Sequence, residues 1–543
     1  MRLKHTLLPA FCASIACALC LPAHGQTFSG PLHITAGGSY SGNWQSLDPT
    51  VPAVIVDTTA AVTIHDSIIQ SAGDCINCPN SMAHNLTVQN VSGYGLNPLN
   101  TSYFPGRFIH GDLMSKLVVE HCYLEGTSGI GLNGYTGSRS GDQTILIRYN
   151  QARNIDGRYS LGSGGGSSTT SFYRVQFTQI SNYGAGVPGM EIAWNEIINT
   201  PYKSRVEDNI NIYNTAGTSA SHLLIHDNYV QGAYPANVGD SYSGGGIITD
   251  GGNTSDPNAT TAFVEIYNNQ VVSTGNYGFS NTTGHDNSIH NNRCVSTGYL
   301  ADGTTYSSNS SATGMVNWDD NNDTAKGTFF NDHVQNNNCG LARLSGTTLM
   351  RSDYWLPALD EYSQNSGLGV TLDHNAEMAE FASWRNKLAS NSITPGVPNA
   401  AIIYQAETLK VYASSGDTHR IIGDMNFNGY FGTILDANAA NDYVTYLAPA
   451  IAAHAYDLRI GVKKSAARGI FQFAAASASV GTFSNVGTTQ DLYSATDTWT
   501  EIDLGTWTPA SSSDKLFRFT ITGKNSASSG YAVCVDYVKL IPQ

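Results

Sequence analysis

Residues 225–230 read "IHDNYV", in which two apolar residues enclose an asparagine at the fourth position. The same spacing returns in "IAWNEI" (192–197), "IYNNQV" (266–271) and "IHNNRC" (289–294), and "ILIRYNQA" (145–152) ends in a version of it. Looser copies place Ser67, Cys122 and Asp332 in the asparagine position. Uneven distances between the copies predict stacked coils joined by loops of variable length. An amide that repeats once per coil can bond the next amide and the turn backbone, so we expect a buried asparagine ladder.

A second set of short strand-like segments lies between these copies. It includes "SGIGLNG" (128–134), "DNINIYN" (208–214), "GGIITDG" (245–251) and "GMVNWDD" (314–320), separated by Gly, Asn or Ser turns. Helical periodicity is almost absent before residue 370. This pattern resembles the right-handed parallel β-helix of the pectate-lyase superfamily, which we expect over residues 26–370. A β-propeller is the alternative, but uneven coil lengths argue against blades of regular size.

The sequence "TLDHNAEMAEFASWRNKLAS" (371–390) predicts a helix, because Phe381, Trp384 and Leu388 share one face at helical spacing. We expect this helix to pack against the coils or to cap their open end. A proline-containing linker, "NSITPGVPNA", follows it. Residues 371–400 are therefore predicted to connect two domains.

Alternating strands return over residues 401–543. "IIYQAETL" opens this region, "YAVCVDYVKLIP" closes it, and "NFNGYFGTILDANAANDYVTYLA" lies between them. The three stretches resemble the β-jelly-roll (β-sandwich) carbohydrate-binding modules. The resemblance implies a structural Ca²⁺ held by oxygens that include Glu407 and Asp536, since calcium prefers hard ligands. Both acids could instead be solvated edge carboxylates.

Three aromatic residues of this region are candidates for stacking on sugar rings. They are Tyr430, Trp499 and Trp507. Each could equally belong to the core of the domain.

The N-terminus has the features of an export signal. Arg2 and Lys4 precede an apolar run over residues 7–21, and Ala23-His24-Gly25 supplies a small-x-small cleavage site, so residues 1–25 are predicted to be a signal peptide. We expect a secreted or periplasmic monomer without a membrane anchor. The formal charge of −15 argues against nucleic acid and anionic membranes as partners. A polysaccharide is the partner that we expect.

Strand alternation predicts where such a chain binds. Neighbouring strands lie about 4.8 Å apart and alternate side chains point outward, so the second set of strands predicts a polar groove running across the coils. The expected groove residues are Asn209, Asn211, Tyr213, Asn276, Asn317 and Trp318.

Two acids on this face are the leading catalytic candidates. Asp250 and Asp319 are predicted two strand spacings apart, roughly 9.6 Å at the backbone. Inverting glycosidases hold their carboxyls roughly 6.5–9.5 Å apart, so that one acid protonates the leaving oxygen and the other activates water. Glu207 and Asp240 are further candidates. All four could instead cap turns.

A charge cluster, "KSRVED" (203–208), precedes one of these strands. Lys203 and Arg205, beside Glu207 and Asp208, could serve a polysaccharide lyase or uronate epimerase, which needs a base and a cation that neutralises a uronate. The four charges could also pair with one another at the surface. A non-catalytic glycan-binding surface protein is the third hypothesis, because a groove alone does not define a reaction. The excess of acids favours a glycoside hydrolase over both alternatives.

Overall fold

The computed structural model describes residues 27–140, 144–184, 186–236, 244–306, 309–357 and 361–543. Over these residues the protein is built from β-strands, with one α-helix and three short 3-10 helices, η1 (Pro257–Ala259), η2 (Glu361–Gln364) and η3 (Ala406–Thr408). The predicted all-β class is confirmed. The predicted signal peptide lies outside the described residues.

Parallel strands form three ladders, here called ladders one, two and three, and the chain passes through them in turn. Ladder one contains β1 (Leu32–Ile34), β4 (Val54–Val56), β6 (Ile76–Cys78), β8 (Ile109–Glu120), β10 (Ile130–Tyr135), β15 (Thr178–Gly184), β18 (Asp208–Thr215), β21 (Gly245–Asp250), β24 (Tyr277–Asn281), β27 (Thr313–Asn317) and β31 (Tyr354–Trp355).

Ladder two contains β2 (Gly38–Tyr40), β5 (Val62–Ser71), β7 (His84–Gly95), the second half of β8, β11 (Ile145–Arg148), β16 (Met190–Ala193), β19 (Leu223–His226), β22 (Val264–Tyr267), β25 (Ser288–His290) and β28 (His333–Gln335). Ladder three contains β3 (Asn43–Ser46), the ends of β5 and β7, β9 (Tyr123–Glu125), β12 (Gln151–Arg153), β17 (Glu196–Ile198), β20 (Tyr229–Ala233), β23 (Gln270–Thr274), β26 (Arg293–Ser296), β29 (Asn338–Ser345) and β32 (Ser366–Gly367).

The predicted asparagine ladder is present at the bend between ladders two and three. The Nδ2 of Asn195 donates to Oδ1 of Asn228 at 2.9 Å, and Nδ2 of Asn228 donates to Oδ1 of Asn269 at 2.9 Å. The backbone N–H of each residue donates to the same oxygen. The residue before each asparagine turns the chain with a positive φ, 57° at Trp194 and 53° at Asp227. Each coil is therefore bent at the same point and bonded there to the next coil.

The ends of this ladder differ from the prediction. It starts where the backbone N–H of Cys122 donates to Asn150 Oδ1, and it continues past Asn292 through Asn337 to Asn365. Asp332 is not in it, because its carboxyl accepts the backbone N–H of Asn287 at another bend. The Ser67 hydroxyl accepts the backbone N–H of Gly42 from the preceding coil at 3.1 Å and donates to the carbonyl of His65, so it takes the ladder position without an amide to continue the chain of bonds. Three successive asparagines at 336–338 made the true position ambiguous in the sequence.

Inside the coils, aliphatic side chains lie in register from strand to strand. Ile192 pairs with Ile225, Ile225 with Ile266, and Ile266 with Ile289, and all four are buried. The inward row thus forms a continuous apolar core, which stabilises the stack by removing apolar surface from water.

Two short elements leave this scheme. The hairpin of β13 (Arg158–Ser160) and β14 (Ser167–Phe172) projects from the coils, and β30 (Thr348–Arg351) pairs antiparallel with β29.

Residues 402–542 form two antiparallel sheets with their own buried core. One holds β33 (Ile402–Gln405), β35 (His419–Gly423), β36 (Phe431–Leu435), β38 (Tyr456–Lys464), β42 (Thr498–Trp507) and β44 (Val533–Pro542). The other holds β34 (Lys410–Ser414), β37 (Tyr443–Ile451), β39 (Gly469–Ser477), β40 (Ser484–Asn485), β41 (Gln490–Asp491) and β43 (Ser513–Lys524). The opening strand β33 lies beside the closing strand β44, as the sequence predicted.

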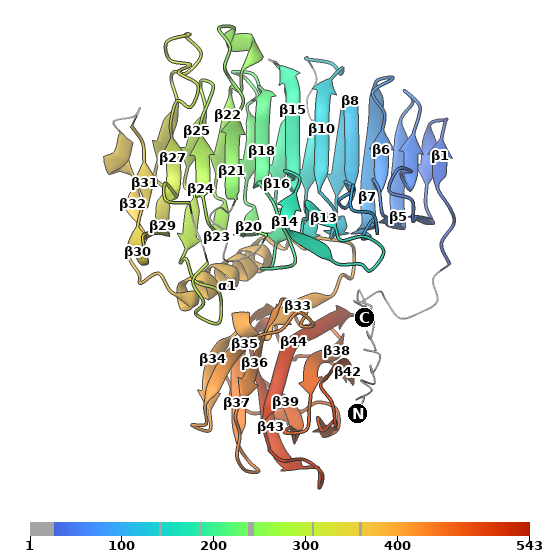
Figure 1. Ribbon diagram of the computed structural model, residues 1–543, viewed down its shortest axis with the longest axis vertical. Helices are drawn as coiled ribbons and strands as arrows, with labels where there is room; N and C mark the ends of the chain where they lie inside the picture. The colour runs from blue at the N-terminus through green and yellow to red at the C-terminus, as the bar shows by residue number, and fades with distance from the viewer. Residues whose placement is uncertain (1–26, 141–143, 185, 237–243, 307–308, 358–360) are drawn as a thin grey trace, which may run out of the picture.

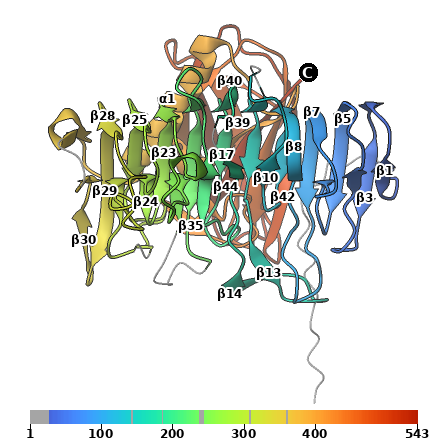
Figure 2. The same cartoon turned by 90° about the horizontal axis from the view of Figure 1, so that it is seen from above.

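Helix α1 (His374–Asn391) begins at the N-cap Asp373 and ends at Ser392. It packs on the side of ladder three and not over an open end. Trp384 is fully buried and its Nε1 donates to Glu196 at 2.8 Å, while Glu380 forms an ion pair with Arg293. Figure 1 shows the helix between the coils and the C-terminal sheets, and Figure 2 shows the same arrangement from above.

A substitution in the asparagine ladder tests its contribution to stability. We expect Asn228→Ala to lower the free energy of unfolding by about 2–4 kcal/mol, because it leaves buried donors of Asn195 without an acceptor. The measurement is denaturant unfolding. Asn258→Ala, at an exposed turn, is the control and is expected to change stability by less than about 0.5 kcal/mol. Equal effects of the two substitutions would show that the ladder is not a major source of stability.

Candidate functional site

The outer face of ladder one carries two rows of side chains in strand register. The first row runs through Gly131, Gln179, Asn211, Ile248 and Ser280. The second runs through Asn133, Ser181, Tyr213 and Asp250. Both rows cross the coils, as the predicted groove does.

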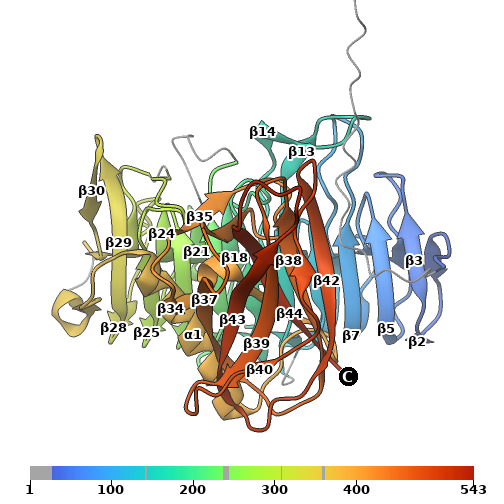
Figure 3. The ribbon, with the colours of Figure 1, turned by 90° about the horizontal axis from the view of Figure 1, so that it is seen from below.

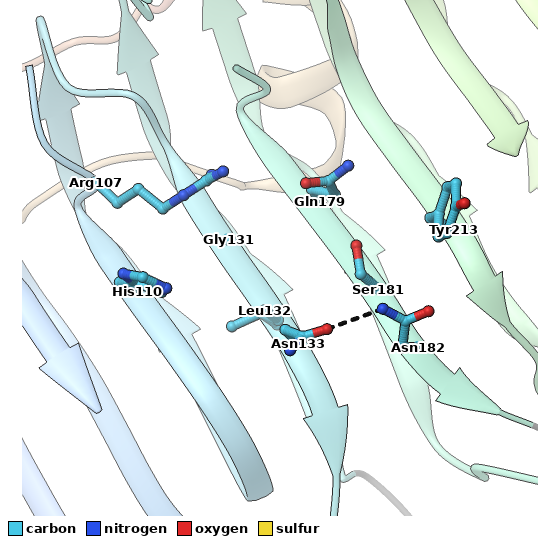
Figure 4. Close-up of a pocket in the computed structure, with 9 residues that line it drawn as sticks. All are labelled: Arg107, His110, Gly131, Leu132, Asn133, Gln179, Ser181, Asn182 and Tyr213. Carbon is cyan, nitrogen blue, oxygen red and sulfur yellow. Dashed lines mark hydrogen bonds between the residues drawn. The ribbon is translucent and has the colours of Figure 1, made fainter. Parts of the chain in front are cut away.

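A hollow of about 310 Å³ lies at the N-terminal half of this face. Figure 4 shows its lining, in which Arg107 and His110 approach from one side and Tyr213 from the other. Gly131 leaves room for the Arg107 guanidinium, because a Cβ there would lie 2.4 Å from its central carbon and would displace the Arg107 side chain. Asn182 donates to Asn133 at 3.0 Å across its floor. The hollow therefore offers hydrogen-bonding groups and one exposed aromatic ring.

An acid cluster, consisting of Glu207, Asp208 and Asp250, adjoins the hollow at Tyr213, which pairs with Asp250. The Nδ2 of Asn211 lies between two of these acids, 3.3 Å from Oδ2 of Asp208 and 3.0 Å from Oδ2 of Asp250. The hydroxyl of Tyr277 donates to the other oxygen of Asp208. Two carboxyls from neighbouring coils are thus bridged by one amide.

Glu207 lies at the accessible edge of the cluster. Its two carboxyl oxygens accept from Arg174 at 3.0 Å and from Gln176 at 3.1 Å. Burial raises the pKa of Glu207 above its usual range despite the opposing charge of Arg174, and the charge of Asp250 adds to the rise.

Asp208 is buried below this edge, with 3% of its surface exposed. Burial, and then the negative charge of Glu207, raise the pKa of Asp208 to about 7. The cluster consequently retains protons at pH values at which ordinary carboxyls are ionised.

Asp319, the predicted partner of Asp250, bonds within its own loop. Asp319 caps its own loop, accepting the backbone N–H groups of Asp323 at 2.6 Å and Thr324 at 2.8 Å. These bonds hold the pKa of Asp319 below its usual range, against the effect of burial. The neighbouring Asp320 is affected by the charge of Asp250. Burial, and then the negative charge of Asp250, raise the pKa of Asp320.

Two of the expected groove residues face inward. Asn209 is fully buried and bonds Asn199 and the carbonyl of Gly232, and Asn317 is fully buried and accepts from Asn281. Asn209 faces inward because strand alternation breaks at the bend into ladder one. At this bend the consecutive residues Asn209 and Ile210 are both buried.

The positive charges of the cluster at 203–208 leave the groove. Lys203 donates from Nζ to the carbonyl oxygens of Phe427 and Asn428 in the C-terminal domain. Arg205 is 2% exposed, and its guanidinium lies 4.3 Å from the ring centroid of Phe172 in the β13–β14 hairpin. Both contacts lie outside the groove, and the role of these two residues in a lyase stays a prediction. Asp240 lies outside the described residues.

The remaining groove candidates differ in exposure. Asn276 is half-buried just before β24, and its carbonyl accepts from Thr313. Trp318 is 41% exposed, and its ring lies 5.4 Å from that of Trp355.

The aromatic candidates of the C-terminal domain are already engaged. The ring of Tyr430 lies 4.4 Å from that of Tyr202, across the interface with the coils. Lys463 Nζ lies 4.6 Å from the ring centroid of Trp499, and Trp507 packs on Tyr456. Stacking on a sugar would require these rings to give up contacts that they make here.

Glu407 and Asp536 lie together in the C-terminal domain, both 6% exposed. Their oxygens suit calcium, and Glu407 Oε2 and Gln405 Oε1 have no hydrogen-bond partner among the described residues. No group of three or more His, Cys, Asp or Glu side chains within the described ranges has the geometry of a metal site. The oxygen donors thus fit a cation chemically but supply only two carboxylates.

Sequence reasoning missed four residues that complete the acid cluster: Arg174, Gln176, Tyr277 and Asp320. The adjacent pair Asp319-Asp320 was a usable signal for the last. The others come from different coils, and no local pattern connects them with Glu207 or Asp208.

No family model matches the chain, and no curated protein matches it. Among solved structures, a Paenibacillus xanthan lyase is 32% identical over 26% of this chain and 13% of its own length, with a TM-score of 0.24. The CBM36-1 domain of a multidomain xylanase from the hindgut metagenome of Trinervitermes trinervoides is 17% identical over 26% of this chain and 98% of its own, with a TM-score of 0.20. A family 35 carbohydrate-binding module from Clostridium thermocellum is 16% identical over 26% and 99%, with a TM-score of 0.19.

This chain spans only 13% of the length of the xanthan lyase. The TM-scores of these matches are too low to support a function, so the proposal below is argued from the geometry of the site. Among the described residues, no helix has the length and apolar character needed to cross a membrane.

The raised pKa of Asp208 predicts a pH dependence of stability. Above about pH 4 an unfolded chain releases this proton, whereas the folded protein keeps it until its pKa of about 7. The folded state therefore binds more protons in this window, and its stability falls as the pH rises. We expect Asp208→Asn to gain stability relative to the wild type between pH 4 and pH 7, measured by thermal unfolding across that range.

The matched control is Asp66→Asn, at an exposed carboxyl whose pKa is lowered by its hydrogen bond with His65. This variant is expected to gain nothing over the same range. The raised pKa of Asp208 is contradicted if the difference in melting temperature between Asp208→Asn and the wild type is the same at every pH.

Proposed function

We propose that the protein is an exported glycoside hydrolase that binds an extended polysaccharide across the strands of ladder one. The observation that carries the proposal is the bridge made by Asn211 between Asp208 and Asp250, beside a hollow lined with hydrogen-bonding groups. Acid–base cleavage of a glycosidic bond needs carboxyls held close together, and this bridge brings acids of neighbouring coils together.

Three further expectations accompany this proposal. The three ladders correspond to the right-handed parallel β-helix of the pectate-lyase superfamily. Residues 401–543 correspond to a jelly-roll module of the carbohydrate-binding type. Residues 1–25 direct export, and the mature protein acts as a monomer outside the cytoplasm.

The two accessible acids take separate roles. Glu207 protonates the leaving oxygen, because burial raises its pKa above the usual range of a carboxyl and it lies at the edge of the cluster. Asp250 takes a proton from the attacking water. Asp208 is a positioning residue, since it is buried and holds Asn211 and Tyr277 in place.

The electrostatics of the cluster favours Glu207 as the acid and Asp250 as the base. Three acids this close cannot all be ionised without mutual repulsion, so a proton stays on the cluster and is available to Glu207. The Asn211 amide donates to Asp250 and fixes the position of its carboxyl.

The test is digestion of a polysaccharide panel, with the products read by mass spectrometry. We expect products that carry one added water, and we expect Asp250→Asn to lower kcat by about 10²–10⁴-fold. Glu207→Gln is expected to lose activity on natural glycans but to retain it on aryl glycosides whose leaving group needs no proton. Asp66→Asn, on an exposed turn away from the groove, is the control and is expected to keep full activity.

The same experiment separates the alternatives. Unsaturated products without added water identify a lyase, and an uncleaved glycan whose uronate residues have changed configuration identifies a uronate epimerase; either result sinks the hydrolase proposal. A glycan that binds without being cleaved identifies a binding protein.

A further inference from the structure

A polar pocket in the C-terminal domain is completed by a side chain from the coils. The pocket contains Gln405 at the end of the opening strand β33, Glu407 in η3 directly after it, and Asp536 in the closing strand β44. The loop 424–430 lies over it. The backbone N–H of Asn428 donates to both oxygens of Asp536, at 3.1 and 2.9 Å.

Two oxygens in this pocket lack donors among the described residues. They are Oε1 of Gln405 and Oε2 of Glu407, and both are buried. A buried acceptor without a partner is costly, and two such acceptors beside a second buried carboxyl point to a cation. The pocket thus carries a concentration of negative charge that the C-terminal domain alone leaves unbalanced.

The positive charge comes from Lys203, which lies in the turn between β17 and β18. Its ammonium bonds the carbonyl oxygens of Phe427 and Asn428, the latter at 3.0 Å, in the loop that covers the pocket. Burial raises the pKa of Glu407 and brings the pKa of Asp536 to about 7, and the charge of Lys203 opposes the rise at both carboxyls. The ammonium is therefore close enough to act on both.

The surroundings hold this arrangement in place. The rings of Tyr202, next to Lys203, and Tyr430 lie 4.4 Å apart. His374, at the start of α1, bonds the carbonyl of Glu407 at 2.7 Å. A Cβ on Gly429 would lie 3.1 Å from Glu407 Oε1, so the covering loop approaches the carboxyl closely. Figure 3 shows the C-terminal domain against the middle coils, where this contact is made.

We propose that Lys203 supplies the positive charge of this pocket from its contact with the covering loop, in place of a hard divalent cation such as calcium. The lysine makes the pocket independent of metal. The lysine also links the two domains electrostatically. Its ammonium reaches the pocket only when the C-terminal domain is docked on the coils, so the pocket has its balancing positive charge only in the docked state. This inference does not depend on the reaction catalysed in the groove.

The test measures how calcium changes the melting temperature of the full-length protein. The wild type is expected to have the same melting temperature in EDTA and in millimolar calcium chloride, and to show no calcium binding by calorimetry. Lys203→Met is expected to melt several degrees lower in EDTA and to recover in calcium, with one calcium bound per chain. Lys410→Met, an exposed lysine of β34, is the control and is expected to behave as the wild type.

Lys203→Gln is a second variant in case Lys203→Met does not fold, since glutamine removes the charge and keeps a donor for the carbonyls. The same calcium dependence is expected of it. Stoichiometric calcium binding by the wild type overturns the proposal. So do lysine variants whose stability calcium does not change.

Discussion

The asparagine at the bend between ladders two and three is the constraint on which the coils depend. Its amide carries a donor and an acceptor on one short side chain, so each residue can receive from the coil before it and give to the coil after it. Because Oδ1 of Asn228 accepts both the backbone N–H and the Nδ2 of Asn195, the bend is fixed in position as well as in direction. The strands that leave the bend therefore start in register. The same register aligns the rows on the outer face of ladder one. The acid cluster belongs to these strands and is aligned with them.

The coils could be predicted because their chemistry repeats. Asn195, Asn228 and Asn269 lie at one spacing from apolar neighbours, and only a stack that buries them all satisfies their amides. The end of the ladder could not be predicted in the same way. At residues 336–338 the sequence offers three asparagines in succession, and only the three-dimensional path of the chain selects Asn337.

The site was harder to predict, for two physical reasons. Strand alternation assigns side chains to faces, but it fails at a bend, which is why Asn209 faces the core while Asn211 faces the groove. Charges that are neighbours in sequence also separate across such a bend. Lys203 reaches another domain, Arg205 is buried against a hairpin, and Glu207 alone of the three borders the groove. The placement of Asp250 on the outer face could be predicted because it lies on the regular strand β21, where strand alternation holds.

The spacing of the coils sets a length scale for whatever lies across them. Neighbouring strands are separated by about 4.8 Å, which is close to the advance of one pyranose unit along an extended glycan. A sugar chain crossing ladder one would therefore meet an equivalent position of the protein at every residue. The number of coils between the hollow and Asp250 then acts as a molecular ruler. Under the proposed function, a polymer anchored by one ring in the hollow would present a fixed bond, a few units further on, to the acids, and the coil repeat would set the size of the fragment released.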